Sequence, residues 1–449
     1  MMSARASIAR TAARVAGLLS RTTGRGGTSL PGKVLLRLDP EAIRRLAGDL
    51  RDGSVVISAT NGKTTTATMF ATILRRDGRQ IVHNEAGANM AGGVASTLLR
   101  SRGDLGLFEV DEFWLDAVAD ALQPRLLVLG NLFRDQLDRY GELEAIAERW
   151  RALARTSEAR LVLNADDPAI ADLGREAQRP LYFGIEDSQV ALAQAQHASD
   201  TTHCRSCGAP YRYEHRFVGH LGSYRCDGCH TQRPNPQIAA HHIRLDGIAG
   251  SRFTLALGDD RREVQLPLPG LYNVYNALAA AAGAYALEID AGTIVAGLEA
   301  VQPAFGRGEL VDLAGRPLRI MLVKNPAGAN EILRTLALEP GPIDLLAVLN
   351  DQIADGRDVS WIWDADVEAI ASSVGRVVCS GTRAAEMALR MKYAGVDVGR
   401  IVVCDELATA LDLAAAGADG TLYAIPTYTA MLELRRELVR RGVAGASFA

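Results

Sequence analysis

The sequence predicts an α/β fold of two or three domains with largely parallel sheets. Short apolar runs alternate with segments of helical period along most of the 449 residues, a pattern typical of α/β units. The length exceeds one ordinary domain, and 48% hydrophobic residues are enough for several buried cores. The clearest predicted strands are residues 55–58, 126–129, 161–163, 345–349, 377–379 and 401–404.

Composition and charge describe a soluble protein. The formal net charge of -4 gives no overall attraction to nucleic acid or to an anionic membrane. The apolar runs are interrupted well short of a membrane span. Six cysteines in a chain of this length do not form a disulfide framework, so a reducing cytoplasm is the expected compartment. Cys379 and Cys404, at the ends of apolar runs, are predicted to be small buried residues without a role.

The N-terminal 50 residues are predicted to form a leader helix and linker packed on the next domain. The first 38 residues contain Arg and Lys but no acid. A transit peptide and a basic helix lying on a membrane surface are the alternatives to simple packing. Apolar residues recur at helical spacing, and a turn signal follows them: Ile8, Ala12, Val15, Leu19, then Leu30-Pro31-Gly32.

A phosphate-binding loop is predicted after the strand at residues 55–58. The sequence there is Thr60-Asn61-Gly62-Lys63-Thr64-Thr65, and a helical run follows it. A strand, a Gly-Lys-Thr turn and a helix form the context that such a loop requires. The N-terminus of the helix offers N–H groups to a polyphosphate, Lys63 adds a charge, and the hydroxyl of Thr64 suits Mg²⁺. Thr65 is a second candidate for the same role.

Residues from about 198 to 236 are predicted to be an inserted zinc ribbon. Two Cys-x-x-Cys pairs, Cys204 with Cys207 and Cys226 with Cys229, are separated by eighteen residues. Four thiolates close a tetrahedral site, so the zinc is expected to be structural. Two redox-active pairs are the alternative. Nearby arginines and tyrosines could bind nucleic acid, but Glu214 and Asp227 dilute the charge, and no nucleic acid is expected.

A domain boundary is predicted near residue 303. Residues 51–302 then form a central ATPase domain, which ends in an Ala-rich helical run at 280–301, and residues 303–449 form a second, Rossmann-like α/β domain. In the second domain, a polar segment that contains Asp351, Asp355 and Asp358 follows the strand at 345–349. Ligands of α/β proteins bind at such carboxyl ends of strands.

Several blocks of the chain resemble Mur ligases and folylpolyglutamate synthases. The loop Thr60–Thr65 is similar to the phosphate loop of these enzymes, with Ala59 where Gly is usual. The resemblance implies that Glu109 binds magnesium, and that Asn273 and Arg307 contact the nucleotide. The segment 131–138 resembles a further family block, with Gln136 where most members carry His. Mur-type architecture, ATP and Mg²⁺ are therefore expected.

The C-terminal segments and the ribbon together resemble one family among these, the MurT ligase subunits. This resemblance implies ATP-dependent amidation of the α-carboxylate of D-glutamate in lipid II, through an acyl phosphate. It implies a heterodimer with a GatD-type glutaminase. In that complex, Asp358 is expected to orient the catalytic His of the glutaminase, and Asp351 and Asp355 are the competitors for this role. The expected location is the cytoplasm, with peripheral association at the inner face of the membrane. The alternatives are a ligase that joins an amino acid, and a nucleotide-regulated scaffold whose ribbon binds nucleic acid.

Overall fold

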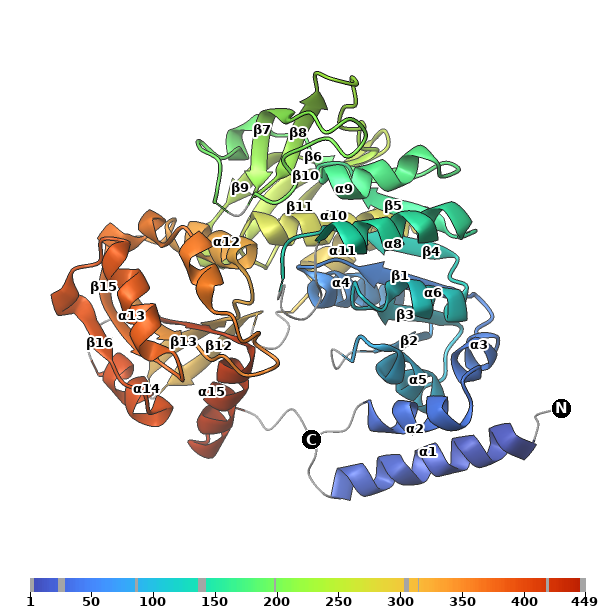
Figure 1. Ribbon diagram of the computed structural model, residues 1–449, viewed down its shortest axis with the longest axis horizontal. Helices are drawn as coiled ribbons and strands as arrows, with labels where there is room; N and C mark the ends of the chain where they lie inside the picture. The colour runs from blue at the N-terminus through green and yellow to red at the C-terminus, as the bar shows by residue number, and fades with distance from the viewer. Residues whose placement is uncertain are drawn as a thin grey trace.

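The chain folds around two separate sheets, as a computed structural model shows (Figure 1). The structure describes residues 4–22, 29–84, 88–135, 143–197, 199–302, 307–313, 315–416 and 420–444. All six predicted strands are present. Of the helices in the described part of the chain, none is long and apolar enough to cross a membrane.

The first sheet has nine strands in the order β11-β10-β9-β6-β5-β4-β1-β3-β2. The strands from β9 to β2 run parallel, and β10 and β11 extend the sheet beyond β9 with antiparallel pairing. The central strands are apolar throughout because helices cover both faces. The strands are β1 (Ser54–Ser58), β2 (Ile81–His83), β3 (Leu105–Glu109), β4 (Leu126–Leu129), β5 (Arg160–Asn164), β6 (Leu181–Ile185), β9 (Ile238–Leu245), β10 (Ser251–Leu257) and β11 (Asp260–Leu266).

Two hydrophobic cores flank this sheet. One packs beneath α4 (Lys63–Arg76), α10 (Leu271–Ala286) and α11 (Ala291–Glu299). The other lies on the opposite face, beneath α2 (Leu30–Leu38), α3 (Ala42–Ala47), α5 (Ala91–Arg100), α6 (Leu115–Leu122), α8 (Leu143–Thr156) and α9 (Pro168–Ala171). Outermost on that side lies α1 (Ala4–Thr22), which packs on α2 through Ala9 and Ala13 (Figure 1).

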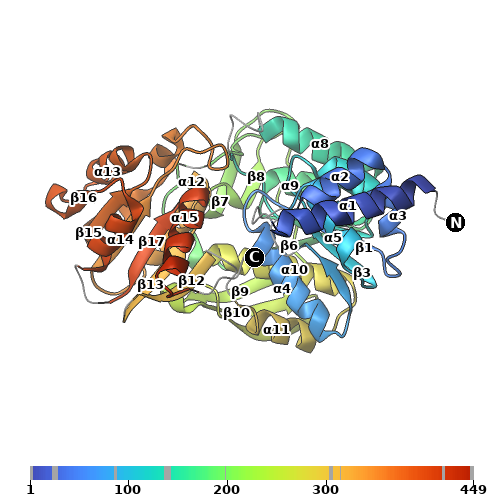
Figure 2. The ribbon, with the colours of Figure 1, turned by 90° about the horizontal axis from the view of Figure 1, so that it is seen from below.

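The second sheet has six strands in the order β12-β13-β17-β14-β15-β16 and is parallel from β13 to β16. Its strands are β12 (Arg307–Leu313), β13 (Arg316–Met321), β14 (Ile343–Val348), β15 (Val374–Ser380), β16 (Ile401–Val403) and β17 (Leu422–Pro426). Four helices cover it, two on each core: α12 (Pro326–Leu336) with α13 (Ala384–Tyr393), and α14 (Leu407–Ala415) with α15 (Tyr428–Arg440). Figure 2 shows this half beside the first, with α12 between them.

The predicted turn at Leu30-Pro31-Gly32 is wrong, because these residues form the first turn of α2. Proline fits the start of a helix, where its missing N–H leaves no bond unmade. Gly32 allows α2 to lie close to α5: a Cβ at this position would lie 1.8 Å from the carbonyl oxygen of Gly92. The segment is therefore part of a helix pair and not a linker.

The predicted helical run at 280–301 is two helices, α10 and α11. The chain breaks between them at Glu288, whose φ is 61°. Asp290 then caps α11 by accepting a hydrogen bond of 2.9 Å from the Thr293 backbone N–H. Cys404 also differs from expectation. It is half-buried because it follows β16 at the edge of the second sheet, whereas Cys379 is buried.

Candidate active site

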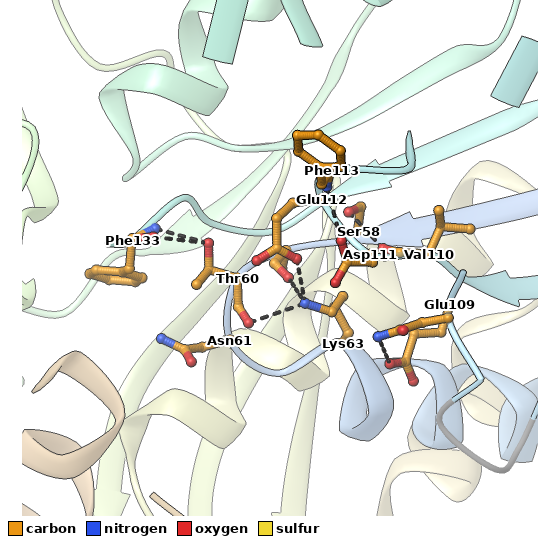
Figure 3. A network of polar contacts seen from close by, with 12 residues as sticks. Ser58, Thr60, Asn61, Lys63, Glu109, Val110, Asp111, Glu112, Phe113 and Phe133 are labelled. Atoms are coloured by element: carbon orange, nitrogen blue, oxygen red, sulfur yellow. Dashed lines mark hydrogen bonds and ion pairs between the residues drawn. The ribbon is translucent and has the colours of Figure 1, made fainter. Parts of the chain in front are cut away.

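The phosphate loop lies between β1 and α4, at the carboxyl edge of the first sheet (Figure 3). Gly62 has φ 89°, and a Cβ there would lie 2.0 Å from Asn276 Oδ1, so the turn requires glycine. The Thr60 hydroxyl accepts a hydrogen bond of 3.0 Å from the Phe133 N–H, and Asn131 Oδ1 accepts one of 2.9 Å from the Asn61 N–H. These bonds fix the loop so that the N-terminus of α4 faces a cavity.

Lys63 is buried at the first position of α4. Its ammonium group donates to Glu112 Oε2 at 2.7 Å and to the Thr60 carbonyl at 3.2 Å (Figure 3). Burial alone would lower the pKa of Lys63, but the carboxylates of Glu112, Asp111 and Glu109 together raise it. The side chain is therefore held as a cation at the cavity wall. Glu112 was not among the predicted site residues, although it lies three residues after the predicted magnesium ligand Glu109.

Glu109 ends β3 and lines the same cavity, at the edge of the sheet where Mg²⁺ was predicted. Its backbone N–H donates to Asn84 Oδ1 at 2.9 Å, and Asn89 Nδ2 donates to its Oε1 at 3.3 Å. A buried carboxylate beside a phosphate loop fits the few protein ligands that Mg²⁺ takes. Thr65 lines the cavity as well, whereas the described lining does not include Thr64. The Mg²⁺ role of Thr64 stays a prediction.

Two further acids surround Lys63. Burial and the neighbouring Glu112 raise the pKa of Asp111, and Lys63 opposes that shift. Burial raises the pKa of Asp135 to about 6, against the opposing charge of Lys324. Carboxyl groups thus outnumber ammonium groups here. Gln136, next to Asp135, lies outside the described residues.

The start of α10 holds two asparagines against the phosphate loop. Asn273 donates to the Pro269 carbonyl at 2.7 Å, and Asn276 donates to Asn273 Oδ1 at 3.0 Å. Thr66 of α4 donates to Asn276 Oδ1 at 3.3 Å. Both asparagines line the cavity. Asn276 was not predicted as a site residue, although its place three residues after Asn273 puts both on one helix face.

The cavity lies between the two halves of the molecule and encloses about 1160 Å³, part of it open to solvent. Asn61 and Asn325 exchange two side-chain hydrogen bonds of 3.2 and 3.0 Å across the junction. Lys324 adds a cation to the wall contributed by the second half. Arg307 begins β12 at this junction, but its side chain lies outside the described part of the chain.

Glu331 of α12 also faces this cavity, and sequence reasoning missed it. Within the described residues, neither carboxyl oxygen makes a hydrogen bond, and the nearest cation, Arg334, is 3.9 Å away. Burial raises the pKa of Glu331 to about 7, although the charge of Arg334 opposes the shift. A buried carboxyl without a hydrogen bond is costly. It therefore offers an acceptor to a bound ligand.

The four predicted zinc ligands form one cluster. The four sulfur atoms all lie within 4.8 Å of one another; they belong to Cys204, Cys207, Cys226 and Cys229. The Cys204–Cys229 and Cys207–Cys226 sulfur separations are 3.5 and 3.4 Å. Four thiols converging at this spacing fit a tetrahedral zinc site with Zn–S bonds of about 2.3 Å. The site has no position left for a substrate.

The ribbon hairpin connects this cluster to the cavity. Its strands are β7 (Tyr211–Val218) and β8 (Leu221–Cys226), and Val218 and Leu221 at the turn line the cavity. At about 3.3 Å per residue, the turn lies on the order of 20 Å from the cysteines. The ring centroid of buried His220 lies 4.6 Å from the ring centroid of Phe133. The backbone N–H of Phe133 is hydrogen-bonded to Thr60 of the phosphate loop. The insert thus completes a wall of the site.

Asp358 lies apart from the cavity, on an exposed loop of the second half. Its Oδ1 accepts a hydrogen bond of 2.8 Å from the Ser360 N–H. Interaction with the side chain of Ser360 and then with its backbone lowers the pKa of Asp358. Asp355 is buried and accepts bonds from both the N–H and the hydroxyl of Thr429. Asp351 is bonded to Thr382 and Arg383, each at 2.9 Å. Of the three acids, Asp358 is the most available to a partner.

Comparison with known proteins assigns the class. The Mur ligase middle domain model matches residues 57–224, and the MurT ligase C-terminal model matches residues 322–431. A pseudomurein peptide ligase type C from Methanothermus fervidus has a TM-score of 0.69 at 26% identity, over 87% of this chain and 79% of its own. MurF from Acinetobacter baumannii, at 19% identity, shares the fold with a TM-score of 0.66, over 92% and 80% of the two chains. Fold and site define an ATP-dependent ligase of the Mur type.

Closer relatives specify the family. The MurT subunit of lipid II isoglutaminyl synthase (glutamine-hydrolyzing) from Streptococcus pneumoniae is 34% identical, over 95% of both chains. Its counterpart from Staphylococcus aureus strain N315 is 33% identical, over 97% of this chain and 98% of its own. The chain belongs to the MurT family.

Proposed function

We propose that the chain amidates the α-carboxylate of D-glutamate in the stem peptide of lipid II, using ATP and ammonia from a glutaminase partner. The observation that carries the proposal is the similarity to MurT subunits over the whole chain. This similarity includes the second half, where a ligase that joins an amino acid would need a different site. The Mur-type cavity between the halves supports the same reading.

In the first step, a carboxylate oxygen of the substrate attacks the γ-phosphorus of ATP. The bond to the bridging oxygen breaks, and ADP leaves with the electron pair. The N-terminus of α4 and the Lys63 ammonium face the phosphates and stabilise the charge that develops on them. Bound Mg²⁺ would neutralise phosphate charge, and Glu109, with Thr64 or Thr65, would hold it.

In the second step, ammonia attacks the acyl carbon of the phosphorylated carboxyl. The carbon–oxygen bond breaks, phosphate leaves with the electron pair, and the nitrogen loses a proton to give D-isoglutamine. Asn61 and Asn325 hold the two halves together beside the cavity. Because the reacting groups are then fixed close together, closure of the halves favours attack by ammonia over attack by water.

The partner is a GatD-type glutaminase that forms a heterodimer with this chain. Asp358 orients the catalytic His of the glutaminase, since an imidazole base needs a carboxylate to fix its tautomer. An exposed apolar surface on the same half supports this docking. Trp363 packs edge-on against Tyr393, with ring centroids 5.8 Å apart, and both are exposed. Ile353 and Leu389 are also exposed there, and such side chains are typical of interfaces.

The four-cysteine cluster binds a structural zinc in this proposal, and the enzyme works at the inner face of the cell membrane, where lipid II carries its stem peptide. One assay tests the activity. The purified chain is given lipid II, Mg²⁺, ATP and ammonium, and phosphate release and product mass are measured. We expect amidated lipid II. Phosphate release that requires an added amino acid instead of ammonium would refute the proposal.

A further inference from the structure

The outermost helix, α1, buries small side chains and exposes larger apolar ones, which is the reverse of an ordinary surface helix. The side chains packed on α2 are small: Ala9 and Ala13 are buried. Three larger aliphatic side chains whose placement the structure describes point to solvent, with Ile8 67%, Val15 49% and Leu18 63% exposed. Steps of seven and three residues place them on one stripe of the helix. In an ordinary surface helix such a stripe would face the core.

The same region carries an unusual concentration of positive charge. Residues 1–38 contain seven Arg or Lys and no acid, within a chain of net charge -4. Removing these seven cations leaves -11 for residues 39–449. Arg14 on α1 and Lys33 and Arg37 on α2 are exposed, and so are Leu30 and Leu38 at the two ends of α2. Arg14 thus lies beside the aliphatic stripe on α1, and Lys33 and Arg37 add exposed cations on the neighbouring helix.

We propose that α1, together with the exposed side of α2, is a docking face for an anionic lipid bilayer. Aliphatic side chains enter the boundary between headgroups and acyl chains, while cations bind the headgroups. The attraction between Arg or Lys and the headgroups is electrostatic and is screened by ions, so the binding is reversible and salt-dependent. A second copy of the chain is a poor occupant, because it would bring two cationic faces together. Nucleic acid would leave the aliphatic stripe without a partner.

This inference rests on the proposed function, because a lipid-linked substrate must meet the enzyme at a membrane. The docking face is connected rigidly to the active site. The Gly32 N–H of α2 donates to Ser96 Oγ of α5 at 2.7 Å. Just before α5, Asn89 lines the cavity and bonds to Glu109. Figure 1 shows α1 along the lower edge of the molecule, and Figure 2, seen from below, shows it facing the viewer.

Vesicle flotation with the full chain tests the docking face. Two vesicle types are used, phosphatidylcholine alone and phosphatidylcholine with phosphatidylglycerol. We expect binding to the anionic vesicles only, decreasing as salt increases. The variant Ile8→Ser/Val15→Ser/Leu18→Ser should bind at least about tenfold less, because it loses the apolar contribution. The variant Arg14→Glu/Lys33→Glu/Arg37→Glu should lose binding as well.

A matched control removes three aliphatic side chains of similar exposure elsewhere: Leu310, Leu338 and Val398, which are 58%, 49% and 62% exposed. The control Leu310→Ser/Leu338→Ser/Val398→Ser should bind like the unmodified chain. Undiminished binding of the Ile8 variant to anionic vesicles would overturn the proposal, and so would equal loss in the control. Binding to duplex DNA that needs the cations but not the aliphatic residues would also overturn it.

A second readout separates this inference from the proposed function. With ammonium and a soluble stem peptide that lacks the lipid, the Ile8 variant should amidate as fast as the unmodified chain, and both should unfold at the same temperature. If neither protein amidates any substrate, the proposed function fails while the flotation result still stands. If the Ile8 variant loses soluble-substrate activity together with binding, it has lost its fold, and the charge variant decides instead: undiminished binding of Arg14→Glu/Lys33→Glu/Arg37→Glu to anionic vesicles would overturn the proposal.

Discussion

The two halves of the molecule present their functional carboxylates in opposite ways. Around Lys63, the acids Glu109, Asp111 and Glu112 are buried; burial and Glu112 raise the pKa of Asp111, and the carboxylates together raise the pKa of Lys63. On the second half, Asp358 is exposed and holds a single backbone hydrogen bond. A buried cluster of this kind can carry out chemistry within one chain, because its geometry is already fixed. In the proposed function, the exposed acid is one half of a site, and the glutaminase partner supplies the other half.

The largest expected effect concerns the buried cluster. Lys63→Ala should lower ammonium-supported amidation on the order of a thousandfold, because the phosphates lose their cation. Phosphate release with lipid II and ammonium measures it, and the exposed Lys392→Ala is the control. Glutamine hydrolysis by the complex should persist in the Lys63 variant. Amidation at the rate of the unmodified chain would contradict the role of Lys63 and, with it, the contrast between the two halves.

A smaller effect is expected at the exposed acid. Asp358→Ala should lower glutamine-supported amidation on the order of a hundredfold, because the partner's imidazole loses its orienting carboxylate. Ammonium-supported amidation should stay unchanged, and the ratio of the two rates is the measurement. Asp397→Ala is a matched control, since exposed Asp397 also accepts one backbone bond of 2.8 Å, from Gly399. A loss that appears with Asp351→Ala instead would assign the role to Asp351.

A third prediction concerns Glu331, a buried carboxyl that the second half contributes to the cavity. The pKa of Glu331 is raised from 4.5 to about 7 in the folded chain. The contribution of this carboxyl to the free energy of unfolding is therefore fully present below pH 4.5 and is lost as the pH rises through 7. Glu331→Gln cannot ionise and should avoid that loss. Relative to the unmodified chain, it should gain on the order of 2 kcal/mol of unfolding free energy between pH 5 and pH 8, at 1.36 kcal/mol per pKa unit. Urea unfolding at several pH values measures this, with exposed Glu158→Gln as the control, and parallel curves would contradict it.

The smallest effect is expected from the ribbon, because its cysteines lie far from the cavity. Removing the metal, by chelation or by Cys226→Ser, should weaken binding of ADP by about tenfold, since Val218 and Leu221 lose their fixed positions. Calorimetric titration measures the affinity, and added zinc should restore it in the chelated protein but not in the variant. Unchanged affinity after loss of the metal would show that the hairpin turn holds its place unaided.

Local signals allowed much of this molecule to be predicted. Buried parallel strands appear as continuous apolar runs, the phosphate loop has a strand and a helix beside it, and paired Cys-x-x-Cys motifs have few other uses. Three of the features that were mispredicted or missed show why others could not be predicted. The start of α2 at Leu30 resembled a turn, because Pro and Gly suit both. The pairing of Asn61 with Asn325 spans 264 residues and leaves no periodicity in the sequence. Glu331 lies on an ordinary amphipathic helix, and only the packing of the two halves buries it.

The pairing of Lys63 with Glu112 has a consequence for how the enzyme is loaded. Glu112 is paired with the loop's cation, so a triphosphate that binds Lys63 has to compete with an anion that is tethered in place. A bare polyanion would also meet Glu109 and Asp111 at close range and be repelled. The arrangement therefore selects for nucleotide whose charge has been offset beforehand, and it keeps small stray anions from occupying the loop between turnovers.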